Sequence, residues 1–289
     1  MDLCVTRRTA LMTLAGATAL TACAMRQEVT RPHLDGVVWQ PSRATLDPKG
    51  NWQLLGVSSL LVQWSAVDGF SFLTDAGMPT IEADMPDWTR IAAEPWAQNV
   101  ILGLAGIHDE ARARASLSTL ASQSHALMQA AAALPLQIRG WYFPVEVDPT
   151  WQNAQGLKSV LEDLPRPLWI SAYDSANLGP QTLADWIDRW VPSDVGIFFQ
   201  DGVGVHARVP AVARTYLEHL SQRLGRARVR VIAEAFRPAM GGGFRSACAD
   251  ELLPQILSYT EWPIYAFDGP HYLHAELVND LLARGIGRD

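Results

Sequence analysis

The chain has 289 residues, of which 48% are hydrophobic and 18% are charged, which is typical of a folded globular protein. Its formal net charge is -7, and no basic run follows the first residues, which argues against a nucleic-acid-binding function. The length suits one large domain or two small ones, and no stretch after Cys23 resembles a transmembrane helix.

The first residues have the features of a bacterial lipoprotein signal. Arg7 and Arg8 form a positive region ahead of the apolar residues 9–21, which are too few to span a bilayer comfortably. The apolar run ends in a Leu-Thr-Ala-Cys motif at Cys23 that resembles a lipobox, in which the Cys carries lipid. The alternatives are a plain Sec signal with a chance Cys and a twin-arginine signal, which the Arg pair resembles faintly.

This signal predicts a protein of the bacterial cell envelope, anchored by lipid and facing the periplasm, with the outer membrane as the expected site. The predicted parts are a signal peptide over residues 1–22, a polar tether over residues 23–33 and one domain over residues 34–289. Cys4 would leave with the signal and Cys23 would be lipidated, so Cys248 alone can form neither an intramolecular disulfide nor a Cys-based metal site.

Eight apolar segments alternate with eight segments of helical pattern along the domain. Strands are predicted over residues 35–41, 58–64, 99–104, 139–145, 168–173, 194–201, 228–234 and 263–268. Helices are predicted over residues 46–55, 86–98, 109–133, 150–164, 181–191, 210–224, 250–259 and 273–283, the first of them interrupted by Pro and Gly. This alternation predicts an α/β protein with a parallel sheet that closes into a single (β/α)8 TIM barrel. A doubly wound open sheet is the competing fold, but the first strand lacks its glycine-rich turn.

Catalytic groups of such a barrel lie at the carboxyl ends of the strands. The strand ends carry acids, amides and aromatic rings, namely Trp39, Gln40, Gln63, Trp64, Glu146, Asp148, Tyr173, Asp174, Gln200, Asp201, Glu234 and Asp268. They include no Ser-His-Asp arrangement and no nucleophile elbow. Carboxylates beside aromatic rings are typical of glycosidic bond cleavage, in which one acid protonates the leaving oxygen and another acts as nucleophile or activates water.

Glu146 ends the fourth predicted strand and Glu234 ends the seventh. These positions resemble the clan of retaining barrel glycosidases, whose acid/base and nucleophile glutamates occupy the same two strand ends. The resemblance implies that Glu146 is the acid/base and Glu234 the nucleophile, and we keep Asp201 as a reserve catalytic acid. The chain departs from the clan at Val145, where the clan usually has Asn.

A second resemblance covers nearly the whole domain. The start at residues 35–41, the segment 62–64, the aromatic strand 140–148 that ends in Glu-Val-Asp, and the Phe-Gln-Asp-Gly-Val-Gly segment 199–204 carry it. Together they resemble a bacterial domain-of-unknown-function family of glycoside hydrolase-like TIM barrels. The resemblance implies a reaction class, glycoside hydrolysis without a cofactor, and leaves the glycan open.

Other strand-end residues are predicted to bind the substrate, a polysaccharide or oligosaccharide. The predicted set is Trp39, Gln63, Trp64, Asp148, Tyr173, Gln200 and Asp268. The amides and Tyr173 would hold sugar hydroxyls, and the two Trp rings, with Trp141, would stack on sugar faces. Asp148 precedes a Pro and Asp268 precedes Gly-Pro, so a helix N-cap and a turn are their structural alternatives.

Two other functions fit the same residues. The first is a non-catalytic glycan-binding lipoprotein of an envelope or exopolysaccharide assembly. The second is a metal-assisted barrel hydrolase or lyase that uses Glu146, Asp148 and Asp201, because carboxylates suit hard cations. For the hydrolase we expect a monomer with no metal and no cofactor. A carboxyl separation of about 5–5.5 Å would indicate retention and about 6.5–9.5 Å inversion.

Overall fold

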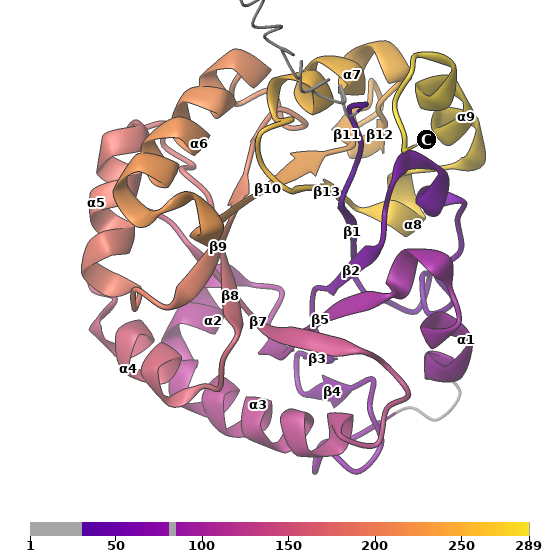
Figure 1. The fold of residues 1–289 in the computed structure, drawn as a ribbon. Coiled ribbons are helices and arrows are strands. Elements are labelled where there is room, and N and C mark those ends of the chain that lie inside the picture. The colour runs from indigo at the N-terminus through magenta and orange to yellow at the C-terminus, as the bar shows by residue number, and fades with distance from the viewer. Residues whose placement is uncertain (1–30, 81–84, 289) are drawn as a thin grey trace, which may run out of the picture. The chain divides into compact units, whose positions relative to one another are not determined.

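Parallel strands and the helices between them close into a barrel in the computed structural model, which describes residues 31–80 and 85–288 (Figure 1). The barrel strands are β1 (Gly36–Trp39), β2 (Ser59–Val62), β5 (Asn99–Gly103), β7 (Ile138–Val147), β8 (Leu168–Ala172), β9 (Val195–Gln200), β10 (Val229–Glu234) and β13 (Ile264–Phe267). They pair in the order β1-β13-β10-β9-β8-β7-β5-β2, and β2 pairs back to β1. The predicted (β/α)8 barrel is therefore confirmed. The predicted signal peptide, Cys23 and most of the tether lie outside the described residues.

Helices surround the barrel on its outside (Figure 1). They are α1 (Trp88–Ala92), α2 (Glu110–Ala115), α3 (Leu117–Ala131), α4 (Gln155–Asp163), α5 (Pro180–Trp190), α6 (Pro210–Leu224), α7 (Ala249–Ser258), α8 (Gly269–Tyr272) and α9 (Ala275–Ala283), with 3-10 turns η1 (Trp52–Leu55), η3 (Pro95–Ala97) and η4 (Arg226–Arg228). Within the described part of the chain, none of them is long and apolar enough to cross a membrane.

Some predicted helices differ from the observed ones. The helix predicted over residues 86–98 ends at Ala92, because Pro95 lacks the backbone N–H that would continue it, and Pro95 begins the separate turn η3. The long helix predicted over residues 109–133 is broken at Ser116 into α2 and α3. Only the short turn η1 forms within residues 46–55.

Side chains of the strands alternate between two cores. The inner core fills the barrel with Val38, Leu61, Ile101, Tyr142, Trp169, Phe198, Ile232 and Tyr265. The larger outer core lies between strands and helices and includes Trp39, Val62, Phe143 and Phe199. Because side chains alternate along a strand, a residue two or four positions after an inner-core residue lies on the same, inward face. At the carboxyl ends of the strands, the residues at these positions are Gln40, Gln63, Glu146, Tyr173, Gln200, Glu234 and Phe267. We call this end of the barrel the carboxyl rim.

Two small sheets extend the carboxyl rim. The strands β3 (Ala66–Val67), β4 (Phe70–Ser71) and β6 (Ala105–Gly106) form one of them, after β2 and β5. The hairpin β11 (Phe236–Pro238) and β12 (Phe244–Ser246) forms the other, after β10. Both sheets belong to loops that follow barrel strands, so they lie at the end where the polar strand-end residues gather.

The chain enters the barrel at the opposite end, where the strands begin and which faces the viewer in Figure 1. Asp35 immediately precedes β1, and its Oδ2 accepts the N–H of Ile264 at the start of β13 at 2.9 Å. The backbone N–H of Asp35 donates to the carbonyl oxygen of Ile264 at 2.9 Å. These two bonds fix the incoming chain at the amino-terminal end of the barrel.

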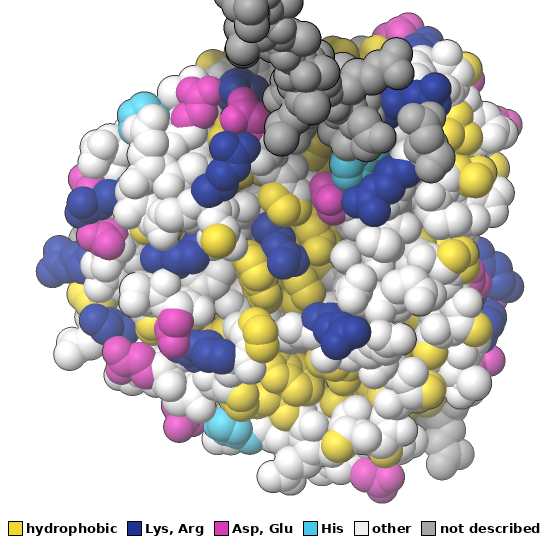
Figure 2. Space-filling model, in the orientation of Figure 1, with side chains coloured by type: hydrophobic (Ala, Val, Ile, Leu, Met, Phe, Trp, Pro, Cys, Tyr) yellow, Lys and Arg dark blue, Asp and Glu magenta, His cyan; other side chains and the backbone are white. Residues whose placement is uncertain are grey.

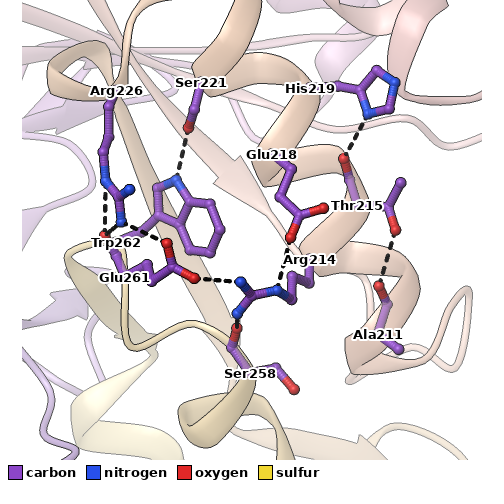
Figure 3. Close-up of polar contacts among 10 residues, drawn as sticks. All are labelled: Ala211, Arg214, Thr215, Glu218, His219, Ser221, Arg226, Ser258, Glu261 and Trp262. Atoms are coloured by element: carbon purple, nitrogen blue, oxygen red, sulfur yellow. Dashed lines mark hydrogen bonds and ion pairs between the residues drawn. The ribbon is translucent and has the colours of Figure 1, made fainter.

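A cluster of polar contacts ties α6 to the segment between α7 and β13 (Figure 3). Arg214 donates from Nη1 to the carbonyl oxygen of Ser258 at 2.9 Å and pairs through Nη2 with Glu261. Trp262 is 4% exposed, and the guanidinium carbons of Arg214 and Arg226 lie 5.4 and 5.3 Å from its ring. Such cation–π contacts strengthen packing, so this cluster holds the outer helices in place behind β10 and β13.

Candidate active site

Glu146 lies inside the barrel at the carboxyl end of β7. It lines a small cavity of about 80 Å³ with Val38, Leu61, Gln63, Tyr142, Gln200, Ile232 and Phe267. Gln200, on β9, donates from Nε2 to Glu146 Oε2. The carboxyl group therefore sits where an apolar barrel interior meets a few polar groups, which is the usual composition of a ligand site.

The pKa of Glu146 is raised to about 7, chiefly because the carboxyl is buried and further because Glu110 places a negative charge beside it. The hydrogen bond from Gln200 and the charge of Arg114 act in the opposite direction. A carboxyl group that titrates near neutral pH can hold a proton at the pH where the protein works and pass it to a substrate. Glu146 thus has the electrostatics of a general acid.

Glu110 and Arg114, on α2, hold the end of β7. Glu110 Oε2 accepts the N–H of Glu146 at 3.2 Å, and Arg114 donates from Nη2 to the carbonyl oxygen of Glu146 at 3.1 Å. Burial raises the pKa of Glu110 as well. The sequence analysis missed both residues because they lie on a helix before the fourth barrel strand, and an acid and a base one helical turn apart are ordinary in a helix.

Glu110→Gln should lower the pKa of Glu146. The change removes a neighbouring negative charge, which makes ionisation of Glu146 easier, while the amide oxygen can still accept the N–H of Glu146. The alkaline limb of the pH profile of kcat/KM should therefore move to lower pH. Glu162→Gln, at an exposed position of α4, is the matched control and should leave the limb in place. A limb that stays or moves upward in the Glu110 variant would contradict this account.

Glu234 ends β10 on the same face as Ile232 and is 5% exposed. Its Oε2 accepts the N–H of Val205 at 3.2 Å, and the backbone of Gly204 also bonds to its carboxyl group. A Cβ at Gly204 would lie 2.6 Å from Glu234 Cβ, so only glycine permits this close approach. Burial, followed by the charge of Asp201, raises the pKa of Glu234.

Tyr173 connects the two glutamates electrostatically. Its pKa is raised mainly by burial and then by the charge of Glu234, and the charge of Glu146 acts in the same direction. Both carboxyl groups therefore act on one hydroxyl group from strands that are separated by β8 and β9. Glu146 and Glu234 both end barrel strands at the carboxyl rim, but the cavity that Glu146 lines does not include Glu234. Their pairing as two catalytic groups stays a prediction.

Asp201 points to the other side of the barrel wall, because it follows Gln200 by one residue. It has no exposed surface, and its Oδ2 accepts from Gln255 Nε2 at 2.7 Å and from the Tyr259 hydroxyl at 3.1 Å, both on or beside α7. Its Oδ1 faces the N–H of Glu234 at 3.3 Å. The structure does not bring Asp201 into the barrel as a reserve catalytic acid, and its contacts make it a residue that positions Glu234.

Neither predicted Trp platform on the first two strands is open to a sugar. Trp39 is 0% exposed, packs against Trp88 with ring centroids 5.6 Å apart, and donates from Nε1 to the carbonyl oxygen of Thr45 at 2.8 Å. Trp64 is 4% exposed and donates to the carbonyl oxygen of Pro41 at 2.9 Å. Both rings support loops at the carboxyl rim from within the protein.

Asp148 and Asp268 are buried and hold loops. Asp148 Oδ2 accepts the N–H of Ser175 at 3.0 Å, which links the loops after β7 and β8, and α4 begins too late for Asp148 to cap it. Asp268 caps α8 by accepting the N–H of His271 at 2.8 Å and also accepts the N–H of Gln40 at 3.2 Å. Asp148 is therefore not the predicted helix N-cap, and Asp268 caps a short helix where a turn was predicted. Both side chains hold loops.

The three acids considered as ligands for a hard cation do not converge. Glu146 faces the interior, Asp148 is bonded to its own and the next loop, and Asp201 lies behind the wall. Over residues 31–80 and 85–288, no group of three or more His, Cys, Asp and Glu side chains has an arrangement that could hold a metal ion.

Gln63 lines the cavity beside Glu146, as predicted. Its Oε1 atom is buried and has no hydrogen-bond partner among the described residues. A buried carbonyl oxygen without a partner is costly, so it has a reason to accept a hydrogen bond from a ligand hydroxyl. The structure thus groups Gln63, Gln200 and Tyr173 with the two glutamates.

A larger groove lies at the carboxyl rim on loops that follow β1, β2 and β5. It measures about 430 Å³ and is lined by Pro41, Ser42, Arg43, Val67, Asp68, Phe70, Ser71, Phe72 and His108. We call it the hairpin groove, because the β3–β4 hairpin contributes most of it. Phe70 is 51% exposed, and His108 Nδ1 lies 2.7 Å from Asp68 Oδ2. The sequence analysis predicted no binding surface here.

Solved structures share the fold. A candidate alpha-L-fucosidase from Bacteroides thetaiotaomicron has a TM-score of 0.61 at 15% identity, over 94% of this chain and 98% of that one. Two other structures have lower TM-scores. A chitinase from Chromobacterium violaceum has a TM-score of 0.49 at 12% identity, over 88% of this chain and 100% of that one. The spore cortex-lytic enzyme SleL of Bacillus cereus has a TM-score of 0.49 at 10% identity, over 90% of this chain and 77% of that one. No protein-family model and no curated protein matches the sequence. The first of these structures agrees with the barrel fold of this chain, and the resemblance to a domain-of-unknown-function family stays a prediction.

Proposed function

We propose that the protein is a glycoside hydrolase that cleaves a polysaccharide or an exported glycan with Glu146 as acid/base and Glu234 as nucleophile. The observation that carries the proposal is Glu146, a buried carboxyl group with its pKa raised to about 7 that lines a cavity inside the barrel with Gln63 and Gln200. A second buried glutamate, Glu234, ends β10 at the same rim. The neighbouring Gln63, Tyr173 and Gln200 offer hydrogen bonds to sugar hydroxyls. The names of the structures that share the fold agree with this reaction class.

In the proposed reaction, Glu146 gives its proton to the leaving glycosidic oxygen while the Glu234 carboxylate attacks the anomeric carbon. The bond to the leaving sugar breaks as a glycosyl ester forms. Glu146, now ionised, then takes a proton from water, and the resulting hydroxide oxygen displaces Glu234. Both side chains return to their starting protonation states, so the cycle balances.

The surroundings of Glu234 act on its charge in both directions. Burial, followed by the charge of Asp201, raises the pKa of Glu234 to about 8, whereas the backbone N–H groups of Val205 and Gly204 and the charge of Arg208 favour the carboxylate. Glu234 must be ionised to act as the nucleophile, and the two backbone N–H groups are the contacts that favour this state. Asp201, on the outer face of the barrel strands, would then influence the pKa of the nucleophile Glu234 without contacting the substrate.

Release of reducing sugars from a panel of bacterial polysaccharides tests the function directly. We expect release from at least one polymer, with loss in the Glu146→Gln and Glu234→Gln variants. NMR of the first product would show retained anomeric configuration. Binding of a polymer without hydrolysis would support the glycan-binding alternative, and activity that chelation abolishes would support the metal-assisted one.

The hairpin groove is proposed to hold sugar units beyond the cleaved bond. Phe70 presents an exposed ring there, and an aromatic contact of about 1–1.5 kcal/mol corresponds to roughly a tenfold change in binding. Phe70→Ala should therefore raise KM for a long glycan by about tenfold with little change in kcat. Leu257→Ala, an exposed apolar position on α7, is the control. An unchanged KM in the Phe70 variant would remove the groove from the substrate path.

We also propose that the protein is attached to the bacterial envelope through lipid on Cys23. The support is the lipobox-like motif in the sequence. Expression in bacteria fed labelled palmitate should label the wild-type protein, and Cys23→Ser should abolish the label. Labelling that survives this change would exclude Cys23 as the anchor.

A further inference from the structure

A second cavity lies at the opposite end of the barrel, where the strands begin. It measures about 310 Å³ and is lined by Ser59, Asn99, Ile101, Arg139, Pro167, Trp169, Arg230 and Tyr265, and we call it the amino-terminal pocket. Figure 2 shows this end of the molecule, with hydrophobic side chains gathered at its centre and Lys or Arg side chains among them. The lining contains two arginines and no acid.

Arg230 provides most of the charge inside the pocket. It lies on the same face of β10 as Ile232, so its side chain is inside the barrel. Its guanidinium carbon is 3.8 Å from the centre of the Trp169 ring, and Nη1 donates to the Tyr265 hydroxyl at 2.9 Å. Among the residues that the structure describes, no carboxylate lies within ion-pair distance of Arg230 or Arg139.

The other N–H groups of Arg230 remain available. Its Nε and Nη2 atoms have no hydrogen-bond partner in residues 31–80 and 85–288. Neither atom is fully buried, so both are accessible from the pocket. Asp35 lies at this end of the barrel too, but its Oδ2 accepts the N–H of Ile264 and its Oδ1 is 3.6 Å from Arg288. A cation inside a barrel without a counter-ion has a strong tendency to bind an anion.

The aromatic walls of the pocket are held rigidly. A Cβ at Gly36 would lie 2.2 Å from Tyr265 Cε1, and a Cβ at Gly196 would lie 2.2 Å from Trp169 Cε3. Each ring therefore lies directly against the backbone of a neighbouring strand, which only glycine allows. The pocket is formed in advance around Arg230, and ligand binding needs little rearrangement.

We propose that the amino-terminal pocket binds a phosphate or carboxylate group carried by a small, sugar-sized molecule. The planar guanidinium of Arg230 offers two parallel N–H groups to such an oxyanion, and Arg139 and Asn99 add donors at the edge. The volume lies at the lower end of the range for small-molecule sites. This site is independent of the proposed hydrolysis, because it lies at the other end of the barrel and shares no lining residue with the cavity beside Glu146.

Titration calorimetry with inorganic phosphate, and separately with glucuronate, tests the proposal in a buffer without other oxyanions. We expect saturable binding to one site with a Kd on the order of 1 mM for at least one of them. Arg230→Gln should weaken anion binding at least tenfold. Arg230→Lys keeps the positive charge but loses the two parallel N–H groups of the guanidinium, so it should weaken binding less. Arg223→Gln, at an exposed ion pair on α6, is the matched control and should bind as wild type. Thermal melting of each variant shows whether it is folded.

Three results would overturn the proposal. The first is the absence of saturable binding of either anion up to about 20 mM, well above the expected Kd. The second is binding that folded Arg230→Gln retains but Glu146→Gln loses, because the anion would then occupy the carboxyl rim. The third is binding only to vesicles that contain phosphatidic acid, because the basic residues would then serve a membrane surface and not a small-molecule pocket.

Discussion

Replacing Glu146 by Gln is expected to lower kcat/KM on a natural glycan by about 10²–10⁴-fold, the usual contribution of general acid–base catalysis. The amide can still accept the hydrogen bond from Gln200 but cannot give a proton to the leaving oxygen. A natural glycan has a poor leaving group, so it depends fully on this proton. Initial rates of reducing-sugar release measure the loss.

A substrate whose leaving group needs no proton can distinguish the loss of the proton donor Glu146 from a general loss of structure. With an activated aryl glycoside, the first step should be far less affected in Glu146→Gln. The alkaline limb that we expect for wild type near the pKa of Glu146, about 7, should be absent from this variant. The limb falls with rising pH in wild type because the acid loses its proton. Glu162→Gln should behave as wild type with both substrates. Equal losses on both substrates would rule out Glu146 as the proton donor.

Glu234→Gln is expected to lower kcat/KM by on the order of 10³-fold or more on both the natural glycan and the activated aryl glycoside. Each factor of ten corresponds to about 1.36 kcal/mol of activation free energy. The nucleophile must attack whatever the leaving group is, so an activated substrate cannot rescue this variant. The amide keeps the size of the carboxyl group and fits against the backbone of Gly204. Parallel assays of Glu146→Gln and Glu234→Gln would therefore give two distinct patterns.

Asp201→Asn provides the contrast for Glu234. The change removes the charge that raises the pKa of Glu234, so its acidic limb should shift to lower pH while much of the activity remains. The Asn oxygen can still accept from Gln255 and Tyr259, but the Asn NH2 group that replaces the other carboxylate oxygen cannot accept the N–H groups of Val203 and Glu234, so those two bonds are lost. If Asp201→Asn abolished activity and Glu234→Gln did not, the assignments of the two acids would have to be exchanged.

The sequence predicted the barrel because its strands are continuous apolar runs, and such runs identify a strand buried on both faces. The same property hides which residues of a strand face the interior. Trp39 and Asp201 each lie one position from an inward-facing Gln, and one position changes the face. The sequence therefore predicted Gln63 and Gln200 together with Trp39 and Asp201 as site residues, and only the inner core of the structure separates the two groups.

Other parts of the site depend on contacts between elements that are distant in the sequence. Glu110 influences Glu146 because α2 packs against β7, and no local pattern marks that contact. The exposed position of Phe70 likewise depends on how a hairpin after the second barrel strand meets the loops after the first and third. Chain-local patterns predict which elements form, whereas pKa values and grooves arise from tertiary packing.

The chain enters the barrel next to Gly36, at the end opposite Glu146 and Glu234, and this bears on which polymers the enzyme could reach. The 12 residues from 24 to 35 span at most about 40 Å when extended. With lipid on Cys23, as the sequence predicts, this length would set how far from the bilayer the barrel can lie. Glycans of the envelope that lie within this distance of the membrane would then be within reach of the proposed active site, whereas polymers released farther away would not.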